Sequence, residues 1–107
     1  MSATLRLPTA DDGMAVAALV EATGVLDVNS VYAYVALLAY FSRTSIVAED
    51  EEGRVVGFVT GFRVPEAPDT LFIWQVGVSE AARGQGLAKR MLLGILGRPQ
   101  VPVFRHL

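Results

Sequence analysis

The sequence predicts an α+β or α/β domain in which a mixed sheet is flanked by helices. Apolar residues recur at helical spacing in two segments of the N-terminal half and in one segment near the C-terminus. Between them lie three strand-like apolar segments joined by short polar turns. The chain has 107 residues, of which 52% are hydrophobic and 19% charged. Residues 1–107 are therefore expected to form a single small domain with one core.

A short strand and a helix are expected first. Residues 5–7 alternate apolar and polar side chains and are followed by Pro8, a pattern typical of an edge strand. Thr9 can then cap a helix, and the acidic pair 11–12 suits the positive end of the helix dipole. Gly24 is expected to end this helix, because glycine readily adopts the left-handed conformation of a C-terminal cap.

A loop at residues 25–30 leads to a second expected helix, which runs from residue 31 to about residue 42. Asn29 or Ser30 can cap this helix. Its apolar residues at helical spacing are expected to face the core: Val31, Tyr34, Val35, Leu38 and Phe41.

The middle of the chain predicts an antiparallel hairpin and a third strand. Residues 46–48 and 54–64 are apolar segments on either side of a polar turn at 50–53. After a loop at 65–69, residues 70–78 predict another strand. This strand is mostly apolar, so it is expected to be central in the sheet.

A glycine-rich turn connects that strand to the last helix, which is expected over residues 86–96. The first amides of a helix have no intrahelical partner, and glycines let an anion approach them closely. Arg83 adds a guanidinium suited to bidentate contact with a phosphate. The order strand, glycine turn, helix therefore predicts an anion site at residues 83–86. The turn lacks the spacing of a P-loop and of a Rossmann dinucleotide site.

The sequence lacks the residues that several other classes of protein need. The chain has no cysteine and one histidine, His106, so disulfides, a metal site and a Ser-His-Asp triad are not expected. Its nine basic residues are scattered and the net charge is −2, which does not favour nucleic-acid binding. The apolar run at residues 34–41 is too short to cross a bilayer, and the N-terminus has no signal-peptide core. A cytoplasmic protein is therefore expected.

The run Arg83-Gly84-Gln85-Gly86-Leu87-Ala88 fits the pattern Arg/Gln-x-x-Gly-x-Gly/Ala. It resembles the pyrophosphate loop of the GNAT-type N-acetyltransferases, which bind acetyl-CoA, and residues 74–82 are similar to that family's central strand and exit turn. The resemblance implies a GNAT-like, mostly antiparallel mixed sheet with acetyl-CoA as co-substrate. It implies cofactor contacts from the following residues: Val76, Val78, Arg83, Gly84, Gln85, Gly86, Leu87 and Ala88.

Other segments resemble a narrower family, the diaminobutyrate acetyltransferases of ectoine biosynthesis. These segments are residues 24–34, 57–63, 68–72 and 74–76. The resemblance implies acetyl transfer from acetyl-CoA to the 4-amino group of L-2,4-diaminobutyrate. It implies substrate contacts from these residues: Asp27, Asn29, Ser30, Tyr32 and Trp74.

Each of these residues also has a purely structural interpretation. Asp27 can bind an ammonium group or stabilise a turn, and Asn29 and Ser30 can bind substrate or cap the helix. Tyr32 and Trp74 can form the wall of the site or stack on a cation. A tryptophan in an apolar strand is also a common core residue.

The sequence does not identify a general base. An alkylamine has a pKa of about 10.4, so its deprotonation at neutral pH costs roughly 4 kcal/mol. A base or a desolvating pocket must offset that cost. In the family, further strands and a helix follow this point and supply the acid and part of the acceptor site. Because residues 101–104 begin another strand-like run shortly before Leu107, we expect an N-terminal portion with weak or no activity and an unpaired strand edge.

Alternatives remain open at this stage. The chain is also compatible with an acetyltransferase for another small amine or a protein N-terminus, and with a non-catalytic interaction module of the same fold. The glycine turn alone is compatible with a phosphate-binding domain that does not use coenzyme A. The family resemblance implies a homodimer.

Overall fold

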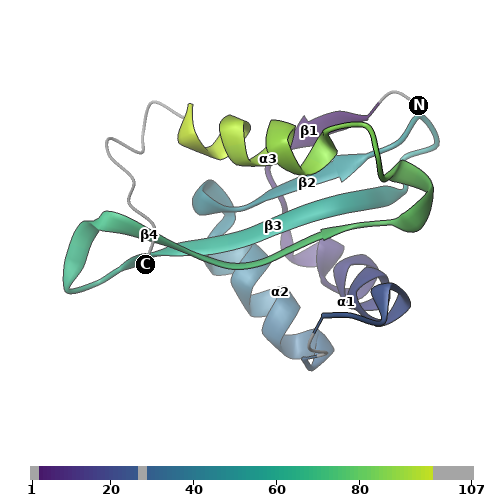
Figure 1. Ribbon diagram of the computed structural model, residues 1–107. Helices are drawn as coiled ribbons and strands as arrows, with labels where there is room; N and C mark the ends of the chain where they lie inside the picture. Colours follow the sequence, from purple (N-terminus) through teal and green to yellow (C-terminus); the bar gives the residue numbers. More distant parts are fainter. Residues whose placement is uncertain (1–2, 27–28, 98–107) are drawn as a thin grey trace.

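The computed structural model describes residues 3–26 and 29–97. These residues form one four-stranded sheet with helices on both of its faces (Figure 1). The main elements are β1 Thr4–Arg6, α1 Gly13–Thr23, α2 Val31–Tyr40, β2 Ile46–Glu49, β3 Val55–Val64, β4 Ala67–Val78 and α3 Leu87–Leu96. Short 3-10 turns lie at Ala10–Asp12, Ser42–Thr44 and Glu80–Ala82.

The strands follow the order β1-β2-β3-β4, and each neighbouring pair is antiparallel. The α+β class and the hairpin at 46–64 are confirmed. The expectation that the third strand is central is wrong for the described residues, where β4 is at the edge of the sheet. Its apolar sequence reflects helices on both faces of the sheet, not a position between two strands (Figure 1). It also begins at Ala67, earlier than expected, because the preceding turn is short.

The sheet separates two apolar layers, and the alternation of side chains along β2 shows the division. Ile46 and Ala48 pack toward α3, whereas Val47 packs toward α1 and α2. On the α1/α2 side, Tyr34 and Phe58 are both fully buried and meet edge to face, with ring centroids 6.5 Å apart. This contact anchors α2 to the middle of β3.

The ends of the first two helices follow their capping residues. Gly24 has a φ of 68° and ends α1, as expected. The Ser30 side chain accepts a hydrogen bond of 3.2 Å from the Ala33 amide and caps α2. Of the two candidate caps, Ser30 therefore makes the contact.

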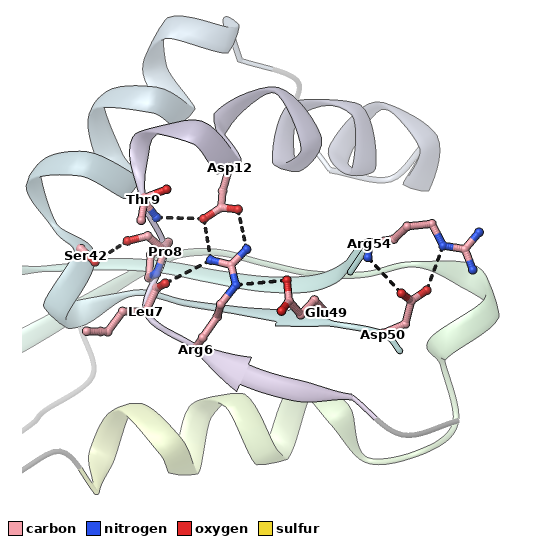
Figure 2. A network of polar contacts seen from close by, with 9 residues as sticks. All are labelled: Arg6, Leu7, Pro8, Thr9, Asp12, Ser42, Glu49, Asp50 and Arg54. Carbon is pink, nitrogen blue, oxygen red and sulfur yellow. Dashed lines mark hydrogen bonds and ion pairs between the residues drawn. The ribbon is translucent and has the colours of Figure 1, made fainter. Parts of the chain in front are cut away.

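Arg6 on β1 joins three segments through one guanidinium (Figure 2). Its two terminal nitrogens donate to the two carboxylate oxygens of Asp12 at 2.8 and 2.9 Å, and its Nε donates to Glu49 at 3.1 Å. The Thr9 amide donates to the same Asp12 carboxylate at 2.8 Å. The hydrogen bonds from Arg6, together with that from Thr9, lower the pKa of Asp12.

Replacement of Asp12 by asparagine is expected to lower the free energy of unfolding by about 2 kcal/mol at pH 7, because it removes charge-assisted hydrogen bonds at a mostly buried carboxylate. The folded pKa lies below the unfolded value of about 3.9, so this stabilisation is present above that pH. It is lost as the pH falls through the folded pKa. Urea unfolding of wild type and Asp12→Asn is expected to show a difference that shrinks below a pH of about 4.

The matched control for this change is Asp11→Asn, an exposed neighbour in the same turn. It is expected to leave the free energy of unfolding within about 0.5 kcal/mol of wild type. A difference between wild type and Asp12→Asn that stays constant across the acid range would contradict the role given to the Arg6–Asp12 pair.

Candidate functional site

The turn between β4 and α3 owes its shape to two glycines. Gly84 has a φ of 80° and Gly86 a φ of 71°, both in the left-handed region. A Cβ atom at either position would meet no atom within 4 Å. Close packing therefore does not explain why these residues are glycines. Their left-handed backbone conformation does, and the absence of side chains leaves the backbone amides accessible to a ligand.

A hollow of about 200 Å³ lies at this turn. It is lined by Val78, Ala82, Arg83, Gly84, Gly86, Leu87, Ala88 and Lys89. Six of the eight residues predicted to contact the cofactor are among these. The other two are Val76, which packs against the apolar layer under α3, and Gln85, which is exposed in the turn.

The electrostatics of this hollow suit an anion. The Arg90 amide donates to the Gly86 carbonyl at 3.0 Å, so the amides of residues 87–89 form the first turn of α3 and have no partner four residues back. The first turn of α3 contains no acidic residue. The Arg83 Nε donates to the Val78 carbonyl at 3.1 Å, which holds the guanidinium beside the end of β4. Arg90 points elsewhere and donates to the Ala3 carbonyl at 3.1 Å.

A β-bulge in β4 shapes the second part of the candidate site. Thr60 on β3 is opposite Gln75, but its neighbour Gly61 is opposite Ile73, so Trp74 is the extra residue. As a result, the consecutive residues Trp74 and Gln75 both reach Tyr34. The rings of Tyr34 and Trp74 are 6.0 Å apart, and the Tyr34 hydroxyl donates to Gln75 Oε1 at 2.9 Å.

A hollow of about 380 Å³ opens beside this bulge and has a size suited to a small molecule. We call it the bulge hollow; it is lined by Val25, Leu26, Asn29, Trp74 and Gln75. It brings together two of the predicted substrate residues, Asn29 and Trp74.

The other predicted substrate residues lie differently. Ser30 is exposed and caps α2, and Tyr32 is 77% exposed and does not line the bulge hollow. Asp27 lies outside the described residues, although Leu26 and Asn29 on either side of it line the bulge hollow. The predicted substrate residues are therefore brought together only in part.

Reasoning from sequence missed two residues of this region. Helical spacing correctly placed Tyr34 in the core, where it is fully buried, but gave no sign of its hydroxyl contact. Gln75 was unassigned. A polar amide inside an otherwise apolar strand was the available signal, because a half-buried amide needs hydrogen-bond partners.

A larger hollow of about 590 Å³ lies against α1, on the other side of the β4–α3 turn. Some of the charged side chains in its lining form ion pairs within the protein. Arg6 is bound to Asp12, and Arg54 is bound to Asp50 at 3.0 Å (Figure 2). Arg83 lines this hollow as well as the hollow at the turn of α3.

Two broader properties concern only residues 3–26 and 29–97. Within them, no three His, Cys, Asp or Glu side chains are grouped so that they could hold a metal ion. None of the helices in that part of the chain is long and apolar enough to cross a membrane.

The fold and the glycine turn agree with the comparison against known families. The model of the acetyltransferase (GNAT) family matches residues 16–97, and the chain belongs to this family. The matched range includes most of α1, the sheet from β2 to β4, and the turn that opens α3.

The similar curated proteins are of a more specific kind. The chain is 52% identical over 96% of its length to the L-2,4-diaminobutyric acid acetyltransferase of Chromohalobacter salexigens. It is 47% identical, also over 96% of its length, to the enzyme of the same name from Halomonas elongata. In both comparisons the chain spans about half, 54%, of the relative's length.

A solved structure gives the same result. The diaminobutyrate acetyltransferase EctA from Paenibacillus lautus, in complex with its substrate L-2,4-diaminobutyric acid and coenzyme A, superposes with a TM-score of 0.90 at 44% identity. The superposition covers 94% of this chain and 60% of that one.

Proposed function

We propose that the protein transfers the acetyl group of acetyl-CoA to the 4-amino group of L-2,4-diaminobutyrate. The observation that carries this proposal is the hollow at the start of α3, where two left-handed glycines, unpaired helix amides and Arg83 suit a diphosphate. The names of the relatives support the acceptor. Because the chain spans about half of their length, turnover is proposed for a protein of their length and binding for this chain.

In this proposal the coenzyme lies along β4 and the α3 turn. The diphosphate contacts the turn at residues 83–88, Gln85 included. The outer edge of β4 pairs with no strand among the described residues, so the backbone at Val76 and Val78 can bind the extended pantetheine arm as an added strand would. An amide on the same edge can donate to the thioester oxygen as negative charge develops there.

The acceptor is proposed to bind at the bulge hollow. Trp74 supplies an apolar wall, Asn29 supplies an amide, and Asp27 is the proposed partner of an ammonium group. Tyr32 and the exposed side of Ser30 remain proposed contacts at the rim. The neutral amine nitrogen attacks the thioester carbon, the carbon–sulfur bond breaks, and coenzyme A leaves as a thiolate. The amine also loses a proton, and the general base that accepts it is not assigned to any of these residues.

The substitution Arg83→Ala tests the coenzyme part of this proposal. The loss of a guanidinium at the diphosphate is expected to weaken coenzyme A binding to this chain about tenfold, since a hydrogen bond to a charged group contributes about 1.5–3 kcal/mol. Isothermal titration calorimetry with coenzyme A provides the measurement. The control is Arg43→Ala, in the Ser42–Thr44 turn and outside this hollow, which is expected to bind like wild type.

An equal loss of affinity in both arginine variants would indicate a general charge effect and contradict the site. For the acceptor, wild type is expected to bind L-2,4-diaminobutyrate, and Asp27→Ala is expected to weaken that binding. If the chain prefers another small amine, the proposed acceptor is wrong and that amine is the better candidate for the substrate. A homodimer remains a prediction of the family resemblance, and a cytoplasmic location remains a prediction of the sequence.

A further inference from the structure

We infer that Thr44 and Ser45 are positioning residues for the acceptor site, although neither of them lines it. Their hydroxyls hold the backbone of Gly61 and thereby fix the β-bulge that turns Trp74 toward the bulge hollow. The inference rests on the proposed function, because it concerns one wall of the proposed acceptor site.

The bulge decides which face of the sheet Trp74 occupies. Gln75 contacts Tyr34 on the α1/α2 side, and the next residue, Val76, packs toward α3. In a regular strand Trp74 would face α3, as Val76 does. The extra residue instead places the Trp74 ring 6.0 Å from that of Tyr34, and Ile73 packs toward α3. A shift of the bulge by one residue would therefore remove Trp74 from the bulge hollow.

Gly61 lies where the register shifts, and two side chains hold it from the side of β2. The β2–β3 ladder ends at the pair Ile46 and Val59, before it reaches Gly61. Thr44 Oγ1 donates to the Gly61 carbonyl at 2.6 Å, and the Gly61 amide donates to Ser45 Oγ at 3.2 Å. Both side chains are buried, so these hydroxyls bind the Gly61 backbone groups where no strand does.

The absence of a side chain at Gly61 lets β4 approach closely from the other side. A Cβ atom there would be 3.0 Å from the Phe72 carbonyl oxygen and 3.2 Å from Ile73 Cδ1. It would also be 3.1 Å from the Thr44 carbonyl oxygen. Gly61 is therefore fixed between the Ser42–Thr44 turn and the part of β4 that precedes the bulge, and the ladder accommodates its extra residue at Trp74.

A purely structural role for these hydroxyls predicts a different outcome. Loss of the Thr44 hydroxyl would then lower the free energy of unfolding but leave the acceptor site of the folded protein unchanged. Trp74 is the single tryptophan of the chain, so its fluorescence reports on the bulge alone. Trp74 emission and ligand affinity therefore separate the two roles.

The substitution Thr44→Val removes the hydroxyl and keeps the branched shape of the side chain. It is expected to weaken binding of L-2,4-diaminobutyrate to this chain about fivefold in calorimetric titration. Trp74 emission is expected to move to longer wavelength, because a ring that is no longer held against the α1/α2 layer is more hydrated. Coenzyme A affinity is expected to stay the same, since neither Thr44 nor Gly61 lines the hollow at α3.

The matched control is Thr60→Val, the same change at a fully buried threonine next to Gly61. The Thr60 hydroxyl makes no hydrogen bond within the described part of the chain, so this variant is expected to bind and emit like wild type. Thr44→Ser keeps a hydroxyl and is expected to restore both properties. Gly61→Ala crowds the Phe72 carbonyl and is expected to reproduce the defect; it tests the same claim if Thr44→Val does not fold.

The outcomes separate this inference from the proposed function. If folded Thr44→Val and Gly61→Ala bind diaminobutyrate like wild type, the inference is wrong and the proposed function still stands. A loss of affinity with unchanged Trp74 emission, or an equal loss in Thr60→Val, also contradicts the inference. If wild type binds coenzyme A but not diaminobutyrate, the acceptor part of the proposed function fails, and this inference fails with it.

Discussion

The variant Gly86→Val is expected to lose about 100-fold in coenzyme A affinity, the largest binding effect in this chain. Gly86 precedes α3, and its backbone lines the hollow in which the diphosphate is proposed to bind. A branched side chain there would stand between the ligand and the helix amides. Calorimetric titration with coenzyme A measures the loss.

Gly53→Val is the matched control for this substitution. Gly53 has a φ of 78°, close to the 71° of Gly86, and a Cβ at either position meets nothing within 4 Å. Both variants should therefore lose a similar free energy of unfolding, about 1–2 kcal/mol, from left-handed strain. Gly53 is in the β2–β3 turn and does not line the hollow at α3. Equal coenzyme A affinities in the two variants would contradict the proposed site.

Removal of the ring of Phe58 is expected to produce the largest loss of stability. Phe58 is fully buried on β3, where it meets Tyr34 and packs in the layer under α1 and α2. Phe58→Ala is expected to lower the free energy of unfolding by about 4 kcal/mol, because it loses apolar burial and leaves a cavity. That is a large part of the 5–15 kcal/mol typical of a domain.

Urea or thermal unfolding of the variant measures this effect. The control is Tyr40→Ala at the end of α2, where the side chain is 79% exposed and the expected change is within about 0.5 kcal/mol. A loss below about 1 kcal/mol in Phe58→Ala would show that the two layers are not held together through this ring.

Much of the fold could be predicted because several segments have one-sided patterns. In α3 the apolar residues fall on one face, and Leu87, Met91 and Ile95 are buried there. In α2 apolar residues lie on every side of the helix, so the face that helical spacing indicated is only partly right. Tyr34 and Leu38 are buried there, whereas the equally apolar Val31 is 46% exposed.

The glycine turn was predictable, and the shape of the bulge hollow was not. Six of the eight residues predicted to contact the cofactor, residues 83–88, are consecutive in sequence, so a local pattern indicates them. The bulge hollow depends on a register shift between β3 and β4 that no local pattern encodes. That shift turns Trp74 toward Tyr34, next to Gln75, whose contact with Tyr34 joins residues 41 positions apart. The Arg6–Asp12 ion pair was also missed. The sequence predicted that the acidic pair 11–12 interacts with the helix dipole, and it gave no sign of a contact with Arg6.

The most direct test of the account follows backbone amide resonances during titration with coenzyme A and, separately, with pantetheine, which lacks the diphosphate. We expect the amides of residues 84–89 to shift with coenzyme A and to remain unchanged with pantetheine, because the turn of α3 binds the diphosphate. Unchanged resonances at 84–89 in the presence of bound coenzyme A, or the same shifts with pantetheine, would contradict the account.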